Sequence, residues 1–119
     1  MKNTKIALGK QGEQAAAAYL TRLGYALVEA NWHALQGEFD LIMRDGETLV
    51  FVEVKTRRAS LEAAFESISP RKKRILEQLA YQYLTQNHLD SDWRIDVIAV
   101  TLSPTGQPII EHIQDAFDW

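Results

Sequence analysis

The segment TLVFVEVKT, residues 48–56, restricts the fold of this chain more than any other part of the sequence. It is dense in β-branched and aromatic residues, and such a run is typical of a strand at the centre of a sheet. Two charged residues, Glu53 and Lys55, interrupt it. Because side chains alternate along a strand, both lie on one face. A carboxylate and an ammonium in a buried strand are costly unless they are paired or bound to a metal.

The patterns on either side of this strand predict helices packed against a sheet. Gly24 ends the first helix, Asp45-Gly46 is a hairpin signal, and Ser69-Pro70 is a helix start. The predicted elements are, in order, a helix over 7–23, strands over 25–34, 38–44 and 48–56, a helix over 70–87, and strands over 93–102 and 108–113. Residues 57–68 are ambiguous, a loop with a short helical piece. This order predicts an α/β (α+β) fold with a mixed central sheet.

The composition is that of a small globular protein. A chain of 119 residues fits one domain over residues 1–119. The absence of cysteine excludes disulfides, thiolate metal sites and a cysteine nucleophile. No apolar run has the length of a membrane span, and the first residues lack a secretory core. We therefore expect a cytoplasmic protein that does not enter membranes.

Positive charge is concentrated in one part of a mildly acidic chain. The formal net charge of −3 argues against a general binder of polyanions. Seven of the 13 lysines and arginines nevertheless fall within a twenty-residue stretch. They are Lys55, Arg57, Arg58, Arg71, Lys72, Lys73 and Arg74. The sequence thus allows a local basic surface.

The hairpin turn predicts which charged residues meet. If Asp45-Gly46 is a two-residue loop, Arg44 pairs with Glu47, so that Asp40 opposes Phe51 and Glu38 opposes Glu53. Asp40, Glu53 and Lys55 then share one side of the sheet. A loop longer by one residue would move Asp40 to the other face.

Two carboxylates and a lysine in this arrangement suit a divalent cation and a phosphate substrate. Mg²⁺ or Mn²⁺ takes carboxylate oxygens and keeps water ligands, while a lysine can act on the attacking water. The open alternative is a structural salt bridge from Asp40 or Glu53 to Lys55.

Two motifs in these strands resemble a known signature. GEFDLI at 37–42 and FVEVKTR at 51–57 resemble the D…(E/D)-x-K signature of the restriction-endonuclease-like superfamily. Together with LGKQGEQAA, Arg94-Ile95-Asp96-Val97-Ile98 and Asp115-Ala116-Phe117, they resemble the YraN-like family of bacterial endonuclease candidates along nearly the whole chain. The resemblance implies an αβββαβ nuclease core and kinship with archaeal Holliday junction resolvases.

The resemblance also implies roles for particular residues. Asp40, Glu53 and Lys55 would be the catalytic residues, and Glu13 would join Asp40 and Glu53 as a metal ligand. Phe39 stands where many nucleases have a proline before the aspartate. Glu13 lies beside the apolar stripe of the first helix, so it can face the sheet; the alternative is a glutamate placed there by the helix dipole. Glu38 is a further candidate near the metal.

The start of the second predicted helix carries four cations, where the helix dipole disfavours them. A bound phosphate would relieve this, whereas the alternative is a solvated cap. Lys72 is in line with the apolar stripe and should lean toward the sheet. We name Arg57, Arg58, Lys72 and Lys73 as candidate contacts to a nucleic-acid backbone, which position it without reading its sequence.

The sequence therefore predicts a Mg²⁺- or Mn²⁺-dependent endonuclease that acts on DNA, including branched DNA, by structure rather than sequence. Two alternatives stay open: a nuclease-fold binding module without turnover, and a protein-interaction or assembly factor. A homodimer is plausible by analogy with the resolvases. Arg94 and Asp96 are expected to pair structurally, and His33, His88 and His112 are interpreted as incidental.

Overall fold

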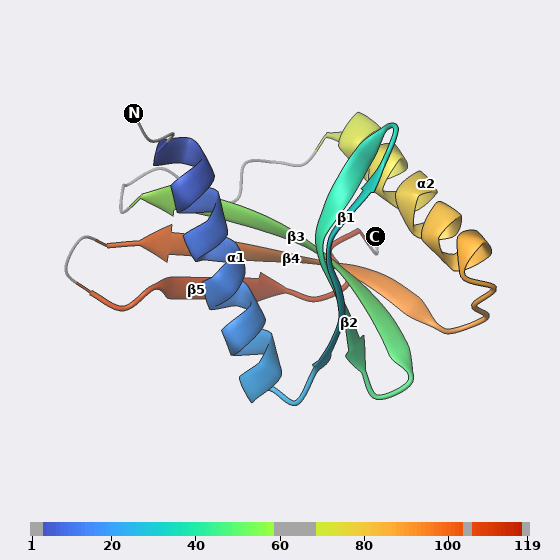
Figure 1. The fold of residues 1–119 in the computed structure, drawn as a ribbon, viewed down its shortest axis with the longest axis horizontal. Coiled ribbons are helices and arrows are strands. Elements are labelled where there is room, and N and C mark those ends of the chain that lie inside the picture. Colours follow the sequence, from blue (N-terminus) through green and yellow to red (C-terminus); the bar gives the residue numbers. More distant parts are fainter. Residues whose placement is uncertain (1–3, 59–68, 104–105, 118–119) are drawn as a thin grey trace.

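The protein folds as a five-stranded mixed sheet with two helices (Figure 1). The structure, a computed structural model, describes residues 4–58, 69–103 and 106–117. The elements run in the order α1 (Thr4–Arg22), β1 (Ala26–Ala34), β2 (Gly37–Asp45), β3 (Thr48–Arg58), α2 (Pro70–Gln86), β4 (Trp93–Leu102) and β5 (Ile109–Ile113). The predicted α/β class and its mixed sheet are confirmed, and the architecture is compatible with a restriction-endonuclease-like core.

The sheet has the order β1-β2-β3-β4-β5, so β3 is central as its composition predicts. β3 pairs with β4 in parallel, and the other three pairings are antiparallel. β5 is an edge strand directly after Pro108, which agrees with the position of that proline. The ambiguous segment 57–68 lies for the most part outside the described residues, as do Pro104 and Thr105 of the predicted turn.

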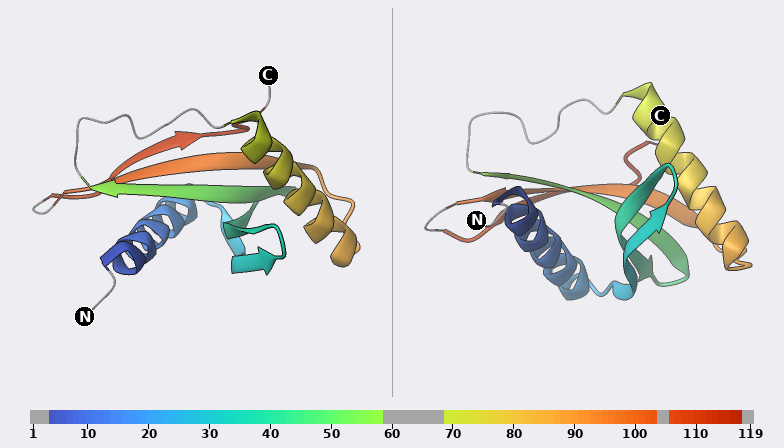
Figure 2. Two further views of the ribbon diagram at one scale, coloured as in Figure 1. Left: turned by 90° about the horizontal axis from the view of Figure 1, so that it is seen from above. Right: turned by 45° about the horizontal axis from the view of Figure 1, so that its top comes forward.

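The two helices cover opposite faces of the sheet (Figure 2). Val50 and Val52 of β3 pack with Ala16 and Leu20 of α1, whereas Phe51 packs with residues of α2. This alternation divides the core into an α1 side and an α2 side. None of the helices in the described ranges is long and apolar enough to span a membrane.

In the β2–β3 hairpin, the two-residue loop lies one residue later in the sequence than predicted. Asp45 pairs with Thr48, so Gly46 and Glu47 form the loop in place of Asp45 and Gly46. Gly46 has a φ of 61°, which suits a glycine in the first loop position of a hairpin turn. The predicted opposition of Asp40 to Phe51 is therefore wrong, because Phe51 pairs with Ile42.

The helix boundaries have identifiable causes. Ser69 caps α2, since its side-chain oxygen accepts a hydrogen bond from the Lys72 backbone amide at 3.1 Å, and Pro70 follows at the first helical position. α1 ends at Arg22, shortly before Gly24, which has a φ of 98°. Both helix predictions are thus confirmed to within a few residues.

A candidate metal and nucleic-acid site where two strands part

The candidate site lies where β2 and β3 separate. Their paired register ends at Leu41 and Val52. If this register continued by one residue, Asp40 would lie opposite Glu53. The sequence-based prediction placed Glu38, not Asp40, opposite Glu53. The next amide of β3, that of Val54, donates to Asp40 Oδ2 at 2.8 Å. The Asp40 carboxylate therefore takes the place of a strand carbonyl at the opening between the strands.

A change of face in β2 accompanies this opening. Leu41 packs on the α1 side of the sheet, but Phe39, two residues earlier, packs on the α2 side. Residues two apart in a regular strand share a face, so the strand turns over at Asp40. In the neighbouring strand β1, Asn31 has a φ of 54°, and Asn31 and Asp40 lie between the pairs Ala30–Leu41 and Trp32–Phe39 of the two strands. Asparagine tolerates this left-handed backbone, which explains how both strands rotate here.

Glu13 approaches Asp40 from helix α1, which packs against the sheet. It lies on α1, partly buried, and its carboxyl group is close enough to that of Asp40 for each to affect the pKa of the other. The helix comes close because of Gly12: a Cβ at this position would lie 1.8 Å from Thr56 Oγ1 of β3. A glycine beside Glu13 thus allows α1 to contact the end of β3.

The charges of four carboxylates are coupled at this point. Burial raises the pKa of Asp40 to about 7, aided by repulsion from Glu53, Glu13 and Glu38 and opposed by the hydrogen bond from Val54. The pKa of Glu13 is also raised, mainly by burial and then by the charge of Glu38. The Asp40 carboxyl group therefore keeps its proton to a higher pH than an exposed aspartate does. Of the three residues named as metal ligands from the sequence, Glu13 and Glu53 thus each lie close enough to Asp40 to act on its charge.

Glu53 is held by a different partner. Its Oε2 lies 3.1 Å from Lys72 Nζ at the start of α2, and the Glu53 side chain is only 12% exposed. Lys72 thus leans toward the sheet, as its place on the helix predicts. The described residues include no ion pair between Lys55 and either carboxylate, so the expected alternative of a Lys55 salt bridge is not seen there. Lys55 lies two residues beyond Glu53, partly buried.

The remaining candidate cations lie at the end of β3 and at the start of α2. Arg57 is partly buried and donates to the Thr56 carbonyl at 3.0 Å. Arg58 closes β3 opposite Leu102, but its side chain lies outside the described residues. Lys73 is partly buried in the first turn of α2. These residues and Lys72 come from the end of β3, the strand that carries Glu53, and from the first turn of α2.

The carboxylates are the right kind of ligand for a divalent cation, but among the described residues no three of them lie close enough together to bind one. Carboxylate oxygens are ligands of Mg²⁺ and Mn²⁺, and a cation would relieve the repulsion that raises the pKa of Asp40. In the described part of the chain, however, no group of three or more His, Cys, Asp or Glu side chains is close enough to hold a metal ion. Glu53 would have to leave Lys72 to join Asp40 and Glu13.

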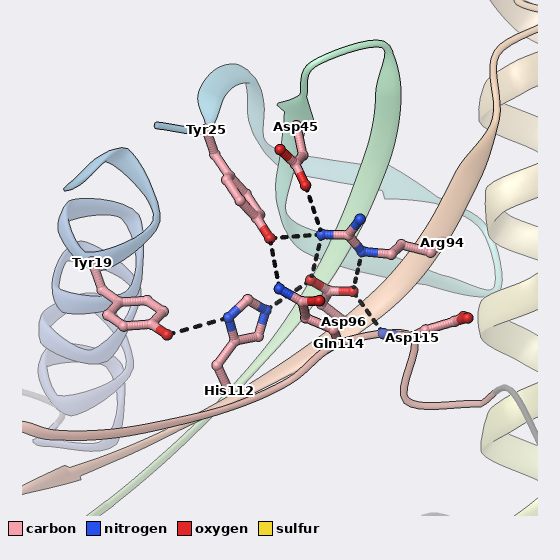
Figure 3. Close-up of polar contacts among 8 residues, drawn as sticks. All are labelled: Tyr19, Tyr25, Asp45, Arg94, Asp96, His112, Gln114 and Asp115. Atoms are coloured by element: carbon pink, nitrogen blue, oxygen red, sulfur yellow. Dashed lines mark hydrogen bonds and ion pairs between the residues drawn. The ribbon is translucent and has the colours of Figure 1, made fainter. Parts of the chain in front are cut away.

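A second polar cluster, around Asp96, was missed in part from the sequence (Figure 3). Asp96 is fully buried on β4 and accepts from Arg94 Nε at 3.0 Å and from the Asp115 amide at 3.0 Å, and it lies 2.7 Å from His112 Nε2. Arg94 Nη2 also donates to Tyr25 Oη at 2.6 Å. Burial alone would raise the pKa of Asp96, but these hydrogen bonds lower it.

This cluster binds the C-terminal segment to the sheet and to α1. The expected pairing of Arg94 with Asp96 is confirmed. The interpretation of His112 as incidental is wrong, because it bridges Asp96 and Tyr19, whose Oη lies 3.4 Å from Nδ1. Only its place in β5 opposite Ile98 reveals this role. All the buried polar side-chain atoms in the described residues have hydrogen-bond partners, so the Asp96 cluster is structural.

Comparison with known proteins places the chain in a family. Residues 12–100, which contain all the candidate site residues, match the family described as "Uncharacterised protein family UPF0102". The chain belongs to this family. The expected membership of the YraN-like family is confirmed at this level.

UPF0102 relatives match the chain along most of its length. A UPF0102 protein of Herpetosiphon aurantiacus is 46% identical over 96% of this chain and 96% of its own. One from Geobacter sulfurreducens is 46% identical over 93% of this chain and 88% of its own. A third, from Chloroflexus aurantiacus, is 48% identical over 85% and 84%. Their names carry the family designation and state no activity.

Proposed function

We propose that this UPF0102 protein is a divalent-metal-dependent endonuclease of the restriction-endonuclease-like superfamily, which hydrolyses phosphodiester bonds in DNA by structure rather than sequence. The observation that carries the proposal is that Glu13 of α1 and Glu53 of β3 both act electrostatically on Asp40 of β2, at the opening between β2 and β3. The cationic first turn of α2 touches the same point through Lys72. Acidic ligands beside cations fit a metal and a phosphate together.

Each residue has a role that its position supports. Glu13, Asp40 and Glu53 would hold Mg²⁺ or Mn²⁺, which polarises the phosphoryl group and activates water. Lys55, two residues beyond Glu53 on β3, would position the attacking water or accept its proton. Arg57, Arg58, Lys72 and Lys73 would contact the phosphate backbone, which fixes the DNA without reading bases.

The Glu53–Lys72 ion pair supports a gating step in this function. Lys72 cannot neutralise Glu53 and a DNA phosphate equally well, because both compete for one ammonium group. DNA that binds the start of α2 would draw Lys72 away and release Glu53 toward Asp40. Metal binding and DNA binding would then favour each other.

A DNA-binding module of the same fold without turnover is the second candidate. The specific observation in its favour is that, among the described residues, no three carboxylates are close enough to hold a metal. The homodimer expected by analogy with the resolvases stays a prediction.

Cleavage of labelled DNA tests the proposed function. A four-way junction, a flap and a plain duplex are incubated with Mn²⁺, Mg²⁺ or EDTA. We expect metal-dependent cutting, with a preference for the branched substrates, that Glu53→Ala and Lys55→Ala reduce by at least about 100-fold. Glu47→Ala and Arg22→Ala, which remove exposed charges of the same signs elsewhere, are the matched controls.

The outcomes separate the two candidates. Cutting that persists in Glu53→Ala, or that the controls lose equally, would overturn the assignment of the site. Binding without cutting by the wild-type protein would favour the binding module.

A further inference from the structure

A groove lies beside the carboxylates on the α1 side of the sheet. It has a volume of about 540 Å³, within the range of pockets that bind small molecules. α1, β1 and β2 supply its lining, which consists of Gly9, Lys10, Glu13, Gln14, Ala17, Leu27, Ala30, Asn31 and Leu41. The small residues on both walls leave this space open.

The lining combines an apolar floor with polar groups. Ala17, Ala30 and Leu41 offer aliphatic surface against which a flat ring can pack. The amides of Gln14 and Asn31 offer both donors and acceptors, which can pair with the edge of a base. Lys10 adds a positive charge close enough to Glu13 to act on its carboxylate. This combination suits a group with an apolar face, a polar edge and a nearby negative charge.

The groove shares Glu13 with the candidate metal site. Glu13 lines the groove and is close enough to Asp40 for each carboxyl group to affect the pKa of the other. Asn31, which also lines it, has the left-handed backbone that accompanies the rotation of β2 at Asp40. A phosphate held at Glu13 and Asp40 would therefore have its own nucleoside within reach of the groove.

We propose that this groove receives an unpaired nucleotide of the strand whose phosphate lies at Glu13 and Asp40. This inference rests on the proposed function and deepens it, because it names the substrate class. A base pair inside a duplex cannot enter a groove between a helix and a strand unless the base is extruded. The preferred substrates would therefore contain single-stranded or unpaired segments, such as flaps and open junctions.

Mapping of backbone amides by NMR tests the groove directly. The ¹⁵N-labelled protein is titrated with a 5′-phosphorylated thymidine tetranucleotide and separately with a blunt duplex, in Mg²⁺ and in EDTA. We expect the tetranucleotide in Mg²⁺ to shift the amides of Gly9, Gln14, Ala30 and Asn31, and the duplex to leave them unmoved. The same titration reports the start of α2 through the amides of Lys72 and Lys73.

Two matched variants sharpen this test. Ala30→Ile adds a strand-forming side chain inside the groove, whereas Ala26→Ile adds the same side chain at an exposed position of β1 outside it. We expect Ala30→Ile to weaken binding of the tetranucleotide by at least about fivefold and Ala26→Ile to leave it unchanged.

Other outcomes would contradict either the inference about the groove or the proposed catalysis. Shifts confined to the start of α2, no shifts at all, or equal effects of the two variants would exclude a nucleotide in the groove. Groove amides that move with protein concentration alone would assign it to a second copy of the chain. Cutting of DNA without a groove response would overturn this inference alone, whereas groove binding without cutting would overturn only the proposed catalysis.

Discussion

Asp40 is the residue on which most of the site depends. It accepts a hydrogen bond from the Val54 amide, and its pKa is affected by the neighbouring charges of Glu53, Glu13 and Glu38. Its fully buried counterpart in the other cluster, Asp96, is surrounded by donors and has a lowered pKa. The pKa values of two aspartates in one sheet are thus shifted in opposite directions. Burial, aided by neighbouring carboxylates, raises that of Asp40, whereas hydrogen bonds from His112, the Asp115 amide and Arg94 outweigh burial at Asp96.

Replacement of Asp40 by asparagine should stabilise the metal-free protein at neutral pH. The pKa of Asp40 is raised to about 7, so the folded protein holds this proton where the unfolded chain has lost it. The contribution of this proton to the free energy of unfolding is therefore complete below about pH 4 and is lost as the pH rises through about 7. Asp40→Asn should raise the free energy of unfolding at pH 8 by about 1–2 kcal/mol, measured by urea denaturation with EDTA.

Asp96→Asn is the control of opposite sign. It leaves the Arg94 guanidinium without its buried carboxylate, so the free energy of unfolding should fall by about 3 kcal/mol. A loss of stability in both variants would contradict the account of Asp40.

Residue patterns explain why part of the site was predictable. The charges Glu53 and Lys55 stand out because they interrupt an apolar strand. The predicted hairpin register adds Asp40, and the family resemblance adds Glu13 as a metal ligand. The rotation at Asp40 is invisible to strand alternation, since it accompanies the backbone of Asn31. The role of His112 depends on the pairing of β4 with β5, which brings distant residues together.

At the scale of elements, the contact of α1 with β3 sets the position of Glu13. Gly12→Ala should force α1 away, because its Cβ would lie 1.8 Å from Thr56 Oγ1. We expect a loss of about 1–3 kcal/mol in the free energy of unfolding and weaker Mn²⁺ binding. Thr56→Ala in the same chain should recover part of both losses, measured by denaturation and calorimetry. Additive effects of the two substitutions would contradict the contact.

The start of α2 restrains the second carboxylate. Lys72→Met should raise the affinity for Mn²⁺ by about three- to tenfold, because Glu53 is freed from its ion pair. Arg71→Met removes the same charge from an exposed position of the same turn and is the matched control. Calorimetric titration measures both variants. Equal affinities in the two variants would exclude a restraint by this ion pair.

Element prediction succeeded where local signals agree. The stop at Gly24 and the cap at Ser69 bound the helices closely, and the composition of residues 48–56 identified the central strand. The hairpin loop was displaced by one residue because Asp45 and Gly46 each suit a turn. In the fold, Arg94 Nη2 on β4 lies 3.3 Å from Asp45 Oδ2, a contact no local pattern contains.

At the scale of the whole molecule, the protein contains two kinds of polar cluster. The Asp96 cluster joins β4, β5, the segment after β5 and α1, and its buried polar atoms have hydrogen-bond partners within the described residues. The carboxylates around Asp40 lie at the other side of β3 and repel one another. Repulsion among partly buried carboxylates is the condition that a divalent cation relieves.

The most direct test is therefore the thermal stability of the protein at pH 7.5 with increasing Mn²⁺. Ligand binding to the folded state should raise the midpoint progressively, by several degrees once Mn²⁺ exceeds its dissociation constant about 100-fold. Asp40→Asn and Glu13→Gln should lose this rise, whereas Glu47→Gln, at the exposed hairpin, should keep it. A midpoint that does not respond to Mn²⁺, or that responds equally in all three variants, would contradict a metal site at Glu13, Asp40 and Glu53.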